Sequence, residues 1–96
     1  MLPLRWTERA VADLAGIAEF ISRTSDVYAE QVVLQIDQRV QLLRRHPHLG
    51  KHALEAEDLD VRELVVDSHR VFYRVRPECI ELLTIVHGRQ FTPREF

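Results

Sequence analysis

Apolar residues in the first quarter of the chain follow two different spacings. Leu2, Leu4 and Trp6 alternate with other residues, which is the period of a strand. Apolar residues then recur every three or four positions, as a helix with one buried face requires, at Val11, Leu14, Ile17, Ala18 and Ile21. Thr7 stands where an N-cap is needed. The pattern predicts a short strand over residues 2–6 and a helix over residues 8–23.

A second helical pattern follows a short polar break that offers Ser25 or Asp26 as its cap. Its apolar residues again recur at three- and four-residue steps, at Ala29, Val32, Val33, Ile36, Val40 and Leu43. The helix is expected to end at His46, because a residue that precedes proline is pushed out of the helical region. Two helices joined by so short a break predict an antiparallel hairpin.

The last third of the chain is rich in β-branched and aromatic residues. Three such runs cover residues 61–66, 70–76 and 80–86, and each is separated from the next by turn-forming residues. They predict an antiparallel meander, with residues 47–60 before it as a loop. The expected fold is a single α+β domain over residues 1–96, with element order β-α-α-β-β-β and an antiparallel sheet covered on one face by the two-helix hairpin.

In the run over residues 70–76, apolar residues alternate with a set that is mainly arginine. Val71, Tyr73 and Val75 form one face, which we expect beneath the helices. The residues between them, which point to the opposite face, are three arginines and one phenylalanine: Arg70, Phe72, Arg74 and Arg76. One face of the sheet should therefore display arginine.

Composition narrows the classes of function. The 96 residues are 46% hydrophobic with a net charge of −2 and a sequence pI of about 6.2. This balance argues against a nucleic acid as the main ligand, because such affinity rests on an excess of Lys and Arg. The single cysteine, Cys79, excludes an internal disulfide and fits a reducing compartment. No segment is apolar over the length of a signal peptide or membrane span, so we expect a cytoplasmic protein with no membrane contact.

The candidate chemistry lies in the arginine-bearing sheet and its histidine. RNA cleavage by 2′-OH attack needs a base, an acid and cations for the developing charge. His87 could serve as acid or base, with Arg62, Arg74 and Arg89 on the phosphate. The alternative is that the arginines pair with carboxylates of the chain or of an acidic partner; the chain's own candidates are Glu63, Asp67, Glu78 and Glu81. His46, His48 and His52 lack the spacing of a metal site, and we expect neither metal nor cofactor.

The residues together resemble the RelE/ParE toxin superfamily, and in particular its ParE-like branch, often called plasmid stabilisation proteins. The resemblance covers nearly the whole chain. Its motifs are Trp6 and Ala10, Asp13-Leu14, Ile17, Phe20-Ile21, Leu43, Pro47-x-x-Gly50-Lys51, Arg62-Glu63-Leu64, Arg70-Val71-Phe72-Tyr73-Arg74-Val75 and Ile85-Val86-His87-Gly88-Arg89.

The resemblance implies a toxin of a type II toxin–antitoxin module. ParE-like members poison DNA gyrase without a nuclease site, whereas RelE-like members cleave mRNA in the ribosome. The absence of lysine from the sheet and the acidic balance favour the ParE-like function. The alternatives are a RelE-like mRNA endonuclease that uses His87, and a toxin fold that serves only as a scaffold or antitoxin-binding module.

The resemblance also implies a partner, a ParD-like antitoxin of the ribbon-helix-helix kind in a hetero-oligomer with the toxin. Apolar candidates for its contact lie off the predicted core faces, at Leu34, Leu42 and Phe91. Four arginines complete the set of candidate partner-binding residues: Arg62, Arg70, Arg74 and Arg89.

Overall fold

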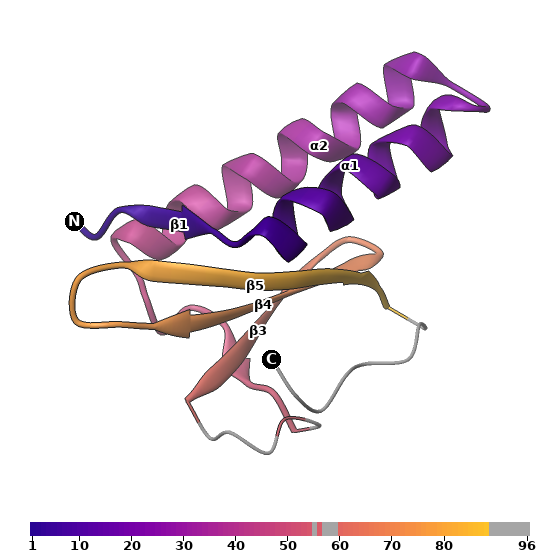
Figure 1. The fold of residues 1–96 in the computed structure, drawn as a ribbon. Coiled ribbons are helices and arrows are strands. Elements are labelled where there is room, and N and C mark those ends of the chain that lie inside the picture. The colour runs from indigo at the N-terminus through magenta and orange to yellow at the C-terminus, as the bar shows by residue number, and fades with distance from the viewer. Residues whose placement is uncertain (55, 57–59, 89–96) are drawn as a thin grey trace.

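The computed structural model describes residues 1–54, 56 and 60–88. Its elements follow the predicted order, with one short additional strand. They are β1 (Leu4–Trp6), α1 (Glu8–Ser22), α2 (Asp26–Gln41), the 3₁₀ turn η1 (Leu42–Arg44), β2 (Lys51–His52), β3 (Val61–Val66), β4 (His69–Val75) and β5 (Ile80–His87). The two helices form a hairpin that lies over one face of the sheet (Figure 1). This confirms the predicted α+β architecture.

In the described part of the chain, five strands form one sheet in the order β1-β5-β4-β3-β2. The meander β3-β4-β5 is antiparallel as expected, but β1 joins the edge parallel to β5, with Leu4 opposite Ile80. The sheet is therefore mixed and not antiparallel throughout. The short strand β2, which pairs with β3, lies within the segment predicted to be a loop, and it places Lys51 in a sheet that was expected to contain no lysine. Strand β1 lies far from β5 in the sequence, and β2 is only two residues long. Local sequence patterns therefore did not reveal either pairing.

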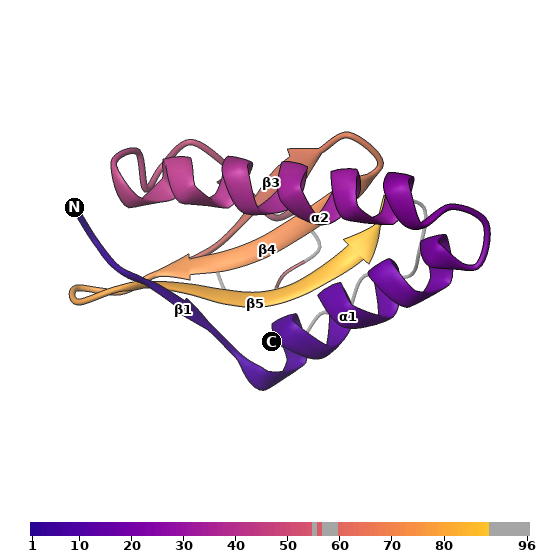
Figure 2. The ribbon, with the colours of Figure 1, turned by 90° about the horizontal axis from the view of Figure 1, so that it is seen from above.

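Side-chain caps fix the beginnings of both helices. Thr7 Oγ1 accepts a hydrogen bond from Ala10 N, and Ser25 Oγ accepts one from Tyr28 N, each at 3.1 Å. The second helix is α-helical only to Gln41 and then tightens into η1, so it ends earlier than the proline at residue 47 had suggested. Seen from above, the helices diverge from the turn that joins them: α2 covers β3 and β4, whereas α1 runs beside β5 (Figure 2).

Apolar side chains are buried on both faces of the sheet. The main core lies between the sheet and the helices and includes Val71 and Tyr73, as predicted; Val75 is partly buried beside it. A second cluster on the opposite face comprises Ala53, Val61, Phe72, Leu83 and Val86. The face expected to display arginine is therefore apolar at its centre. No described helix is long and apolar enough to cross a membrane.

The pairing of β4 with β5 contains a β-bulge. Phe72 pairs with Thr84, but the next residue, Tyr73, pairs with Leu82, so Leu83 is an extra residue on β5. Bulges of this kind bend a strand and increase its twist.

Candidate functional site

The arginines on the sheet face away from the helices are held by carboxylates. Arg70 Nη2 donates to Glu63 Oε2 at 2.7 Å, and its guanidinium carbon lies 4.9 Å from the centre of the Phe72 ring. Both members of the ion pair are largely buried. This strand arginine is thus a structural partner of Glu63, as the alternative interpretation of the sequence expected.

Glu81 is the centre of a second cluster on this face. Its carboxylate is 2.8 Å from Arg5 Nη1, 3.6 Å from Arg74 Nη1 and 3.5 Å from Arg76 Nη2. Glu81 is only 8% exposed, so the three cations offset the cost of burying its charge. We refer to Arg5, Arg70, Arg74 and Arg76 with Glu63 and Glu81 as the arginine face.

Arg62 lies on the other face of the sheet and braces a turn. Its Nη1 donates to Gly50 O at 2.7 Å, while Tyr73 Oη accepts from Gly50 N at 2.9 Å and donates to Pro47 O at 2.8 Å. Burial raises the pKa of the Tyr73 phenol, an effect that the Gly50 hydrogen bond and Arg62 partly offset. The Pro47-x-x-Gly50 motif and Arg62 together therefore fasten the chain after α2 to the sheet.

Two histidines meet at the other end of the sheet. His87 at the end of β5 pairs with His69 at the start of β4, with ring centroids 5.6 Å apart at an interplanar angle of 85°. His69 is 8% exposed. Burial is the main reason that its pKa is lowered; His87 lowers it further and Asp67 opposes the shift. Among the described residues, no hydrogen bond is made by the His69 ring.

These histidines form one end of a cleft of about 690 Å³ between α1, the start of α2 and the sheet. Most of its lining is apolar, and Phe20 and Tyr28 at its rim are 69% and 50% exposed. We call it the histidine cleft; its lining is Ala12, Asp13, Gly16, Ile17, Phe20, Ile21, Tyr28, Ser68, His69, Ile85 and His87.

Asp13 holds α1 against β5 inside this cleft. Its Oδ2 accepts from Thr84 Oγ1 at 2.5 Å and from Ile85 N at 3.1 Å. Strand β1 pairs with β5 only as far as Leu82, so Asp13 satisfies a backbone N–H beyond that pairing. The sequence identified Asp13 only as part of a resemblance. A lone carboxylate on the mostly apolar face of a helix was the available signal for its role.

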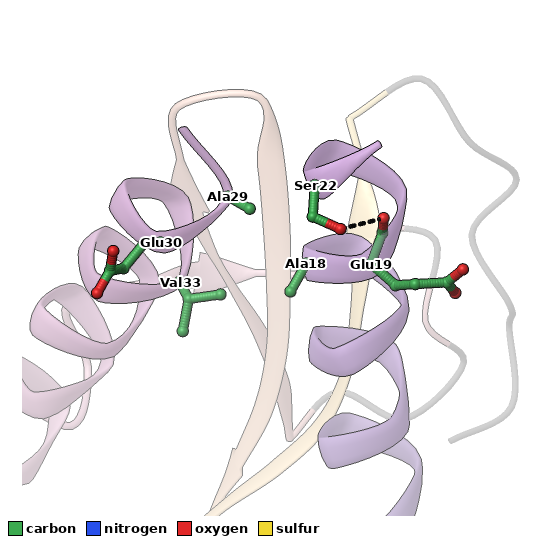
Figure 3. Close-up of a pocket in the computed structure, with 6 residues that line it drawn as sticks. All are labelled: Ala18, Glu19, Ser22, Ala29, Glu30 and Val33. Carbon is green, nitrogen blue, oxygen red and sulfur yellow. Dashed lines mark hydrogen bonds between the residues drawn. The ribbon is translucent and has the colours of Figure 1, made fainter. Parts of the chain in front are cut away.

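A smaller hollow of about 370 Å³ lies between the helices near their connecting turn. Ala18, Ala29 and Val33 point into the gap, whereas the carboxylates of Glu19 and Glu30 point away from it (Figure 3). Ser22 Oγ donates to the Glu19 carbonyl oxygen and is thereby satisfied within its own helix. This hollow brings no polar groups together.

Comparison with known proteins identifies the family. Residues 4–91 match the family described as the ParE toxin of the type II toxin–antitoxin system parDE. The chain belongs to this toxin family. It is 30% identical over 89 residues to Toxin RelE2 of Caulobacter vibrioides, an alignment that covers 92% of this chain and 97% of that protein. It is also 30% identical over 93 residues to the toxin candidate Y4kP of Sinorhizobium fredii, covering 95% of this chain and 93% of the relative.

Solved structures agree with this family. A chain of the chromosomal ParDE toxin–antitoxin system from P. aeruginosa superposes with a TM-score of 0.76 at 27% identity, covering 91% of this chain and 96% of the other. The YoeB dimer from Staphylococcus aureus shares the fold, with a TM-score of 0.62 at 17% identity over 86% of this chain and 92% of the other. The protein is thus a ParE-like toxin of a type II toxin–antitoxin module, and its family implies a cognate antitoxin as its partner.

Among the described candidate catalytic residues, His87 is not brought together with Arg62 or Arg74. Arg62 is in register with Tyr73 and through it with Leu82, five residues before His87, which corresponds to about 17 Å along the strand. Arg74 is on the opposite face against Glu81. Arg89, the third candidate arginine, lies outside the described residues.

The apolar residues expected to contact the antitoxin are exposed where the structure describes them. Leu34 on α2 is 55% exposed and Leu42 in η1 is 47% exposed, while Phe91 lies outside the described residues. Within the described chain, no group of three or more potential ligands could hold a metal ion.

Proposed function

We propose that this ParE-like toxin inhibits DNA gyrase by binding to it and carries no catalytic site of its own. The observation that supports binding over catalysis is the separation of His87 from Arg62 and Arg74. A nuclease must place its acid, its base and its phosphate-binding cations within hydrogen-bond reach of one phosphate. Arg70 and Arg74 instead pair with carboxylates of the toxin, and Arg62 holds one of its turns.

A supercoiling assay tests this proposal directly. Purified toxin added to purified gyrase should inhibit supercoiling and accumulate a complex of gyrase with cleaved DNA. Addition of the antitoxin before the toxin should restore supercoiling, which controls for contaminating nucleases. Gyrase that remains fully active at a large molar excess of folded toxin would refute the proposal.

Ribosome-dependent cleavage of mRNA is the second candidate. It is favoured by the similarity to a relative named Toxin RelE2 and by the His69–His87 pair, which could supply an acid and a base. Primer extension on mRNA translated in the presence of the toxin should then reveal cuts that His87→Ala abolishes and His48→Ala, a substitution in an exposed loop, retains. Unchanged toxicity of His87→Ala would count strongly against this candidate.

The antitoxin is proposed to be a ParD-like protein of the ribbon-helix-helix kind, bound to the toxin in a hetero-oligomer. The ParDE similarity and the exposed Leu34 and Leu42 support this proposal. The protein encoded by the adjacent reading frame should co-purify with the toxin and suppress its toxicity. Either proposed target would place the toxin in the cytoplasm. Harmless expression of the toxin alone would instead favour a scaffold or binding module.

A further inference from the structure

Charge is distributed unevenly between the two ends of the toxin. One end carries the start of β1, the 3₁₀ turn η1 and the β4–β5 turn, whereas the turn between the helices and the β3–β4 turn lie at the other (Figure 1, Figure 2). With histidine counted as neutral, residues 2–5, 42–46 and 74–81 at the first end hold five arginines against two glutamates, a net charge of +3. Residues 19–30 and 65–70 at the other end carry a net charge of −2. We refer to the first as the basic end.

The net charge of the whole chain, −2, conceals this separation. Polyanion affinity depends on an excess of Lys and Arg, which is why composition argued against a nucleic acid as the main ligand. Phosphate contacts nevertheless position many proteins on a duplex without supplying sequence recognition. The basic end offers such a contact, and the composition of the chain did not predict it.

Arg5 and Arg76 combine exposure with a fixed position. Their side chains are 67% and 45% exposed. Arg5 Nη1 lies 2.8 Å from Oε2 of Glu81, and Arg76 Nη2 lies 3.5 Å from Oε1 of the same carboxylate. Arg74 Nη1 approaches this carboxylate as well, at 3.6 Å. Three cations thus share one carboxylate, and the four side chains together carry a charge of +2.

This arrangement suits an anion from outside the chain. A guanidinium has several N–H donors, and within the described chain Arg5 and Arg76 each direct one hydrogen bond to Glu81. Their other donors are accessible to an acceptor because both side chains reach solvent. Contact with Glu81 also restricts the two side chains before any ligand arrives, which lowers the entropic cost of binding. The pair is therefore prepared to bind an oxyanion.

The helical layer adds positive charge to the same end. Leu2 N donates to Arg44 O and Arg44 Nε donates to Leu2 O, each at 3.1 Å, so η1 is fastened to the chain just before β1. Arg45 follows and is exposed. Arginines of the helical layer and of the sheet are thereby held at one end of the molecule.

A phosphate backbone fits the sheet side of this end better than an acidic protein does. No large apolar side chain in residues 2–5 or 74–81 is exposed, whereas protein interfaces usually depend on apolar or aromatic anchors. Phosphate contacts require only charge and donors, and arginine binds phosphate in a bidentate manner. Every basic residue in these two segments is an arginine.

We propose that the basic end binds the phosphate backbone of duplex DNA held by gyrase, with Arg5 and Arg76 as direct contacts. The inference rests on the proposed inhibition of gyrase and adds the DNA of the gyrase complex to the partners of the toxin. So few arginines neutralise few phosphates, so the toxin alone should bind DNA weakly and with a strong dependence on salt. Contact with gyrase supplies the remaining affinity.

Substitutions at the two ends of the toxin test this surface. Arg5→Gln and Arg76→Gln, singly and together, alter the basic end. Arg23→Gln is the matched control, because Arg23 is as exposed as Arg5, at 67%, and also pairs with one glutamate, Glu19. Circular dichroism and urea denaturation establish that each variant is folded before its binding is measured.

The first measurement uses a short fluorescent DNA duplex and the toxin alone over a series of salt concentrations. The double variant should bind about tenfold or more weakly at low salt, and its slope of log affinity against log salt should be smaller by about 2. Arg5→Gln alone should reduce the slope by about 1, and Arg23→Gln should leave it unchanged. A slope that is unchanged in the double variant, or reduced equally in Arg23→Gln, would overturn the proposal.

Two competitors in the same assay test the choice of ligand. Poly-glutamate that displaces the duplex as well as unlabelled DNA of equal total charge would indicate an acidic protein. Tighter binding of an RNA duplex of the same length would indicate RNA. Either result would overturn the assignment of DNA, and weaker competition by both would support it.

The second measurement compares the affinity of the toxin for purified gyrase with and without a bound DNA duplex. DNA should increase the affinity about tenfold or more, because a second contact is then made within one complex. The double variant should lose this increase, and Arg23→Gln should keep it. Equal affinity with and without DNA would refute the inference and leave the proposed function standing. Absence of binding to gyrase would refute the proposed function, and the salt series with the duplex alone would then decide whether the basic end contacts DNA.

Discussion

The arginine face and the histidine cleft both present basic side chains on strands, yet the fold treats them in opposite ways. On the arginine face, Arg70 meets Glu63 and three further arginines converge on Glu81. In the cleft, the ring of His69 is as deeply buried as Glu81 and makes no hydrogen bond with the described residues. The arginine face pairs its charges with carboxylates of the described chain, whereas His69 meets the ring of His87 in a T-shaped contact.

The glycines Gly50 and Gly16 repeat this contrast. A Cβ on Gly50 would lie 2.5 Å from the Glu63 carbonyl oxygen and 2.8 Å from the Tyr73 ring, whereas one on Gly16 would meet open space. Gly50 is explained by the chain itself, and Gly16 is not. Substitutions at both glycines, at Glu81 and at His69 test how far this division holds.

The largest effect is expected for Gly50→Ala. The added methyl group must displace backbone or the buried Tyr73 side chain, which is hydrogen-bonded to Gly50 and Pro47. We expect a loss of about 2–4 kcal/mol in the free energy of unfolding, as for other overpacked or strained sites. Urea denaturation followed by circular dichroism measures the loss. A change below about 0.5 kcal/mol would show that the turn relaxes freely.

A smaller loss, of about 2–3 kcal/mol, is expected for Glu81→Gln, because the substitution leaves buried Arg74 beside a neutral amide. The matched control is Glu19→Gln on α1, which removes the exposed ion pair with Arg23 and should cost less than about 0.5 kcal/mol. Equal losses for the two variants in urea denaturation would mean that the arginine face contributes no more than an ordinary surface pair.

Gly16→Ala should change stability in the opposite direction. The methyl group fits without contact and favours the helix, so the free energy of unfolding should rise by about 0.5–1 kcal/mol. Thermal and urea denaturation measure this gain. A loss of stability would reveal a role for Gly16 within the fold.

The smallest effect concerns the dependence of stability on pH. The pKa of His69 is lowered in the folded protein, so the unfolded chain binds a proton first as the pH falls. This contribution to stability is complete above the ordinary histidine pKa of about 6.5 and is lost as the pH falls through the lowered folded-state value. The native toxin should therefore lose more stability than His69→Gln between pH 7.5 and 5.5, as measured by urea denaturation at each pH. Parallel curves for the two proteins would contradict a buried neutral His69.

Local patterns were sufficient for most of the fold. The spacing of Leu14, Ile17 and Ile21 located α1, and the parity of Val71 and Tyr73 identified the sheet face beneath the helices. Patterns failed where structure depends on distant pairing. The parallel addition of β1 to β5 and the two-residue strand β2 are examples.

The candidate site was less predictable than the fold for the same reason. The alternation of side chains along the strand correctly placed Arg70 and Arg74 on one face. Their pairing with strand carboxylates was one of the expected alternatives. Sequence could not show that His87 would pair with His69, because that contact depends on the register of two strands. Nor could it show that Arg62 turns towards Gly50 and away from the other arginines.

The bulge at Leu83 shifts the register between β4 and β5 by one residue. On one side of it, paired residues of β4 and β5 have positions that add to 155, as in Arg74 with Glu81; on the other side they add to 156, as in His69 with His87. If the same residues paired without the bulge, keeping Glu81 opposite Arg74 would bring Val86 opposite His69 in place of His87. One inserted residue thus allows a fixed ionic cluster and a histidine pair to occupy the same two strands. An evolving toxin could change one end of this hairpin without changing the register of the other.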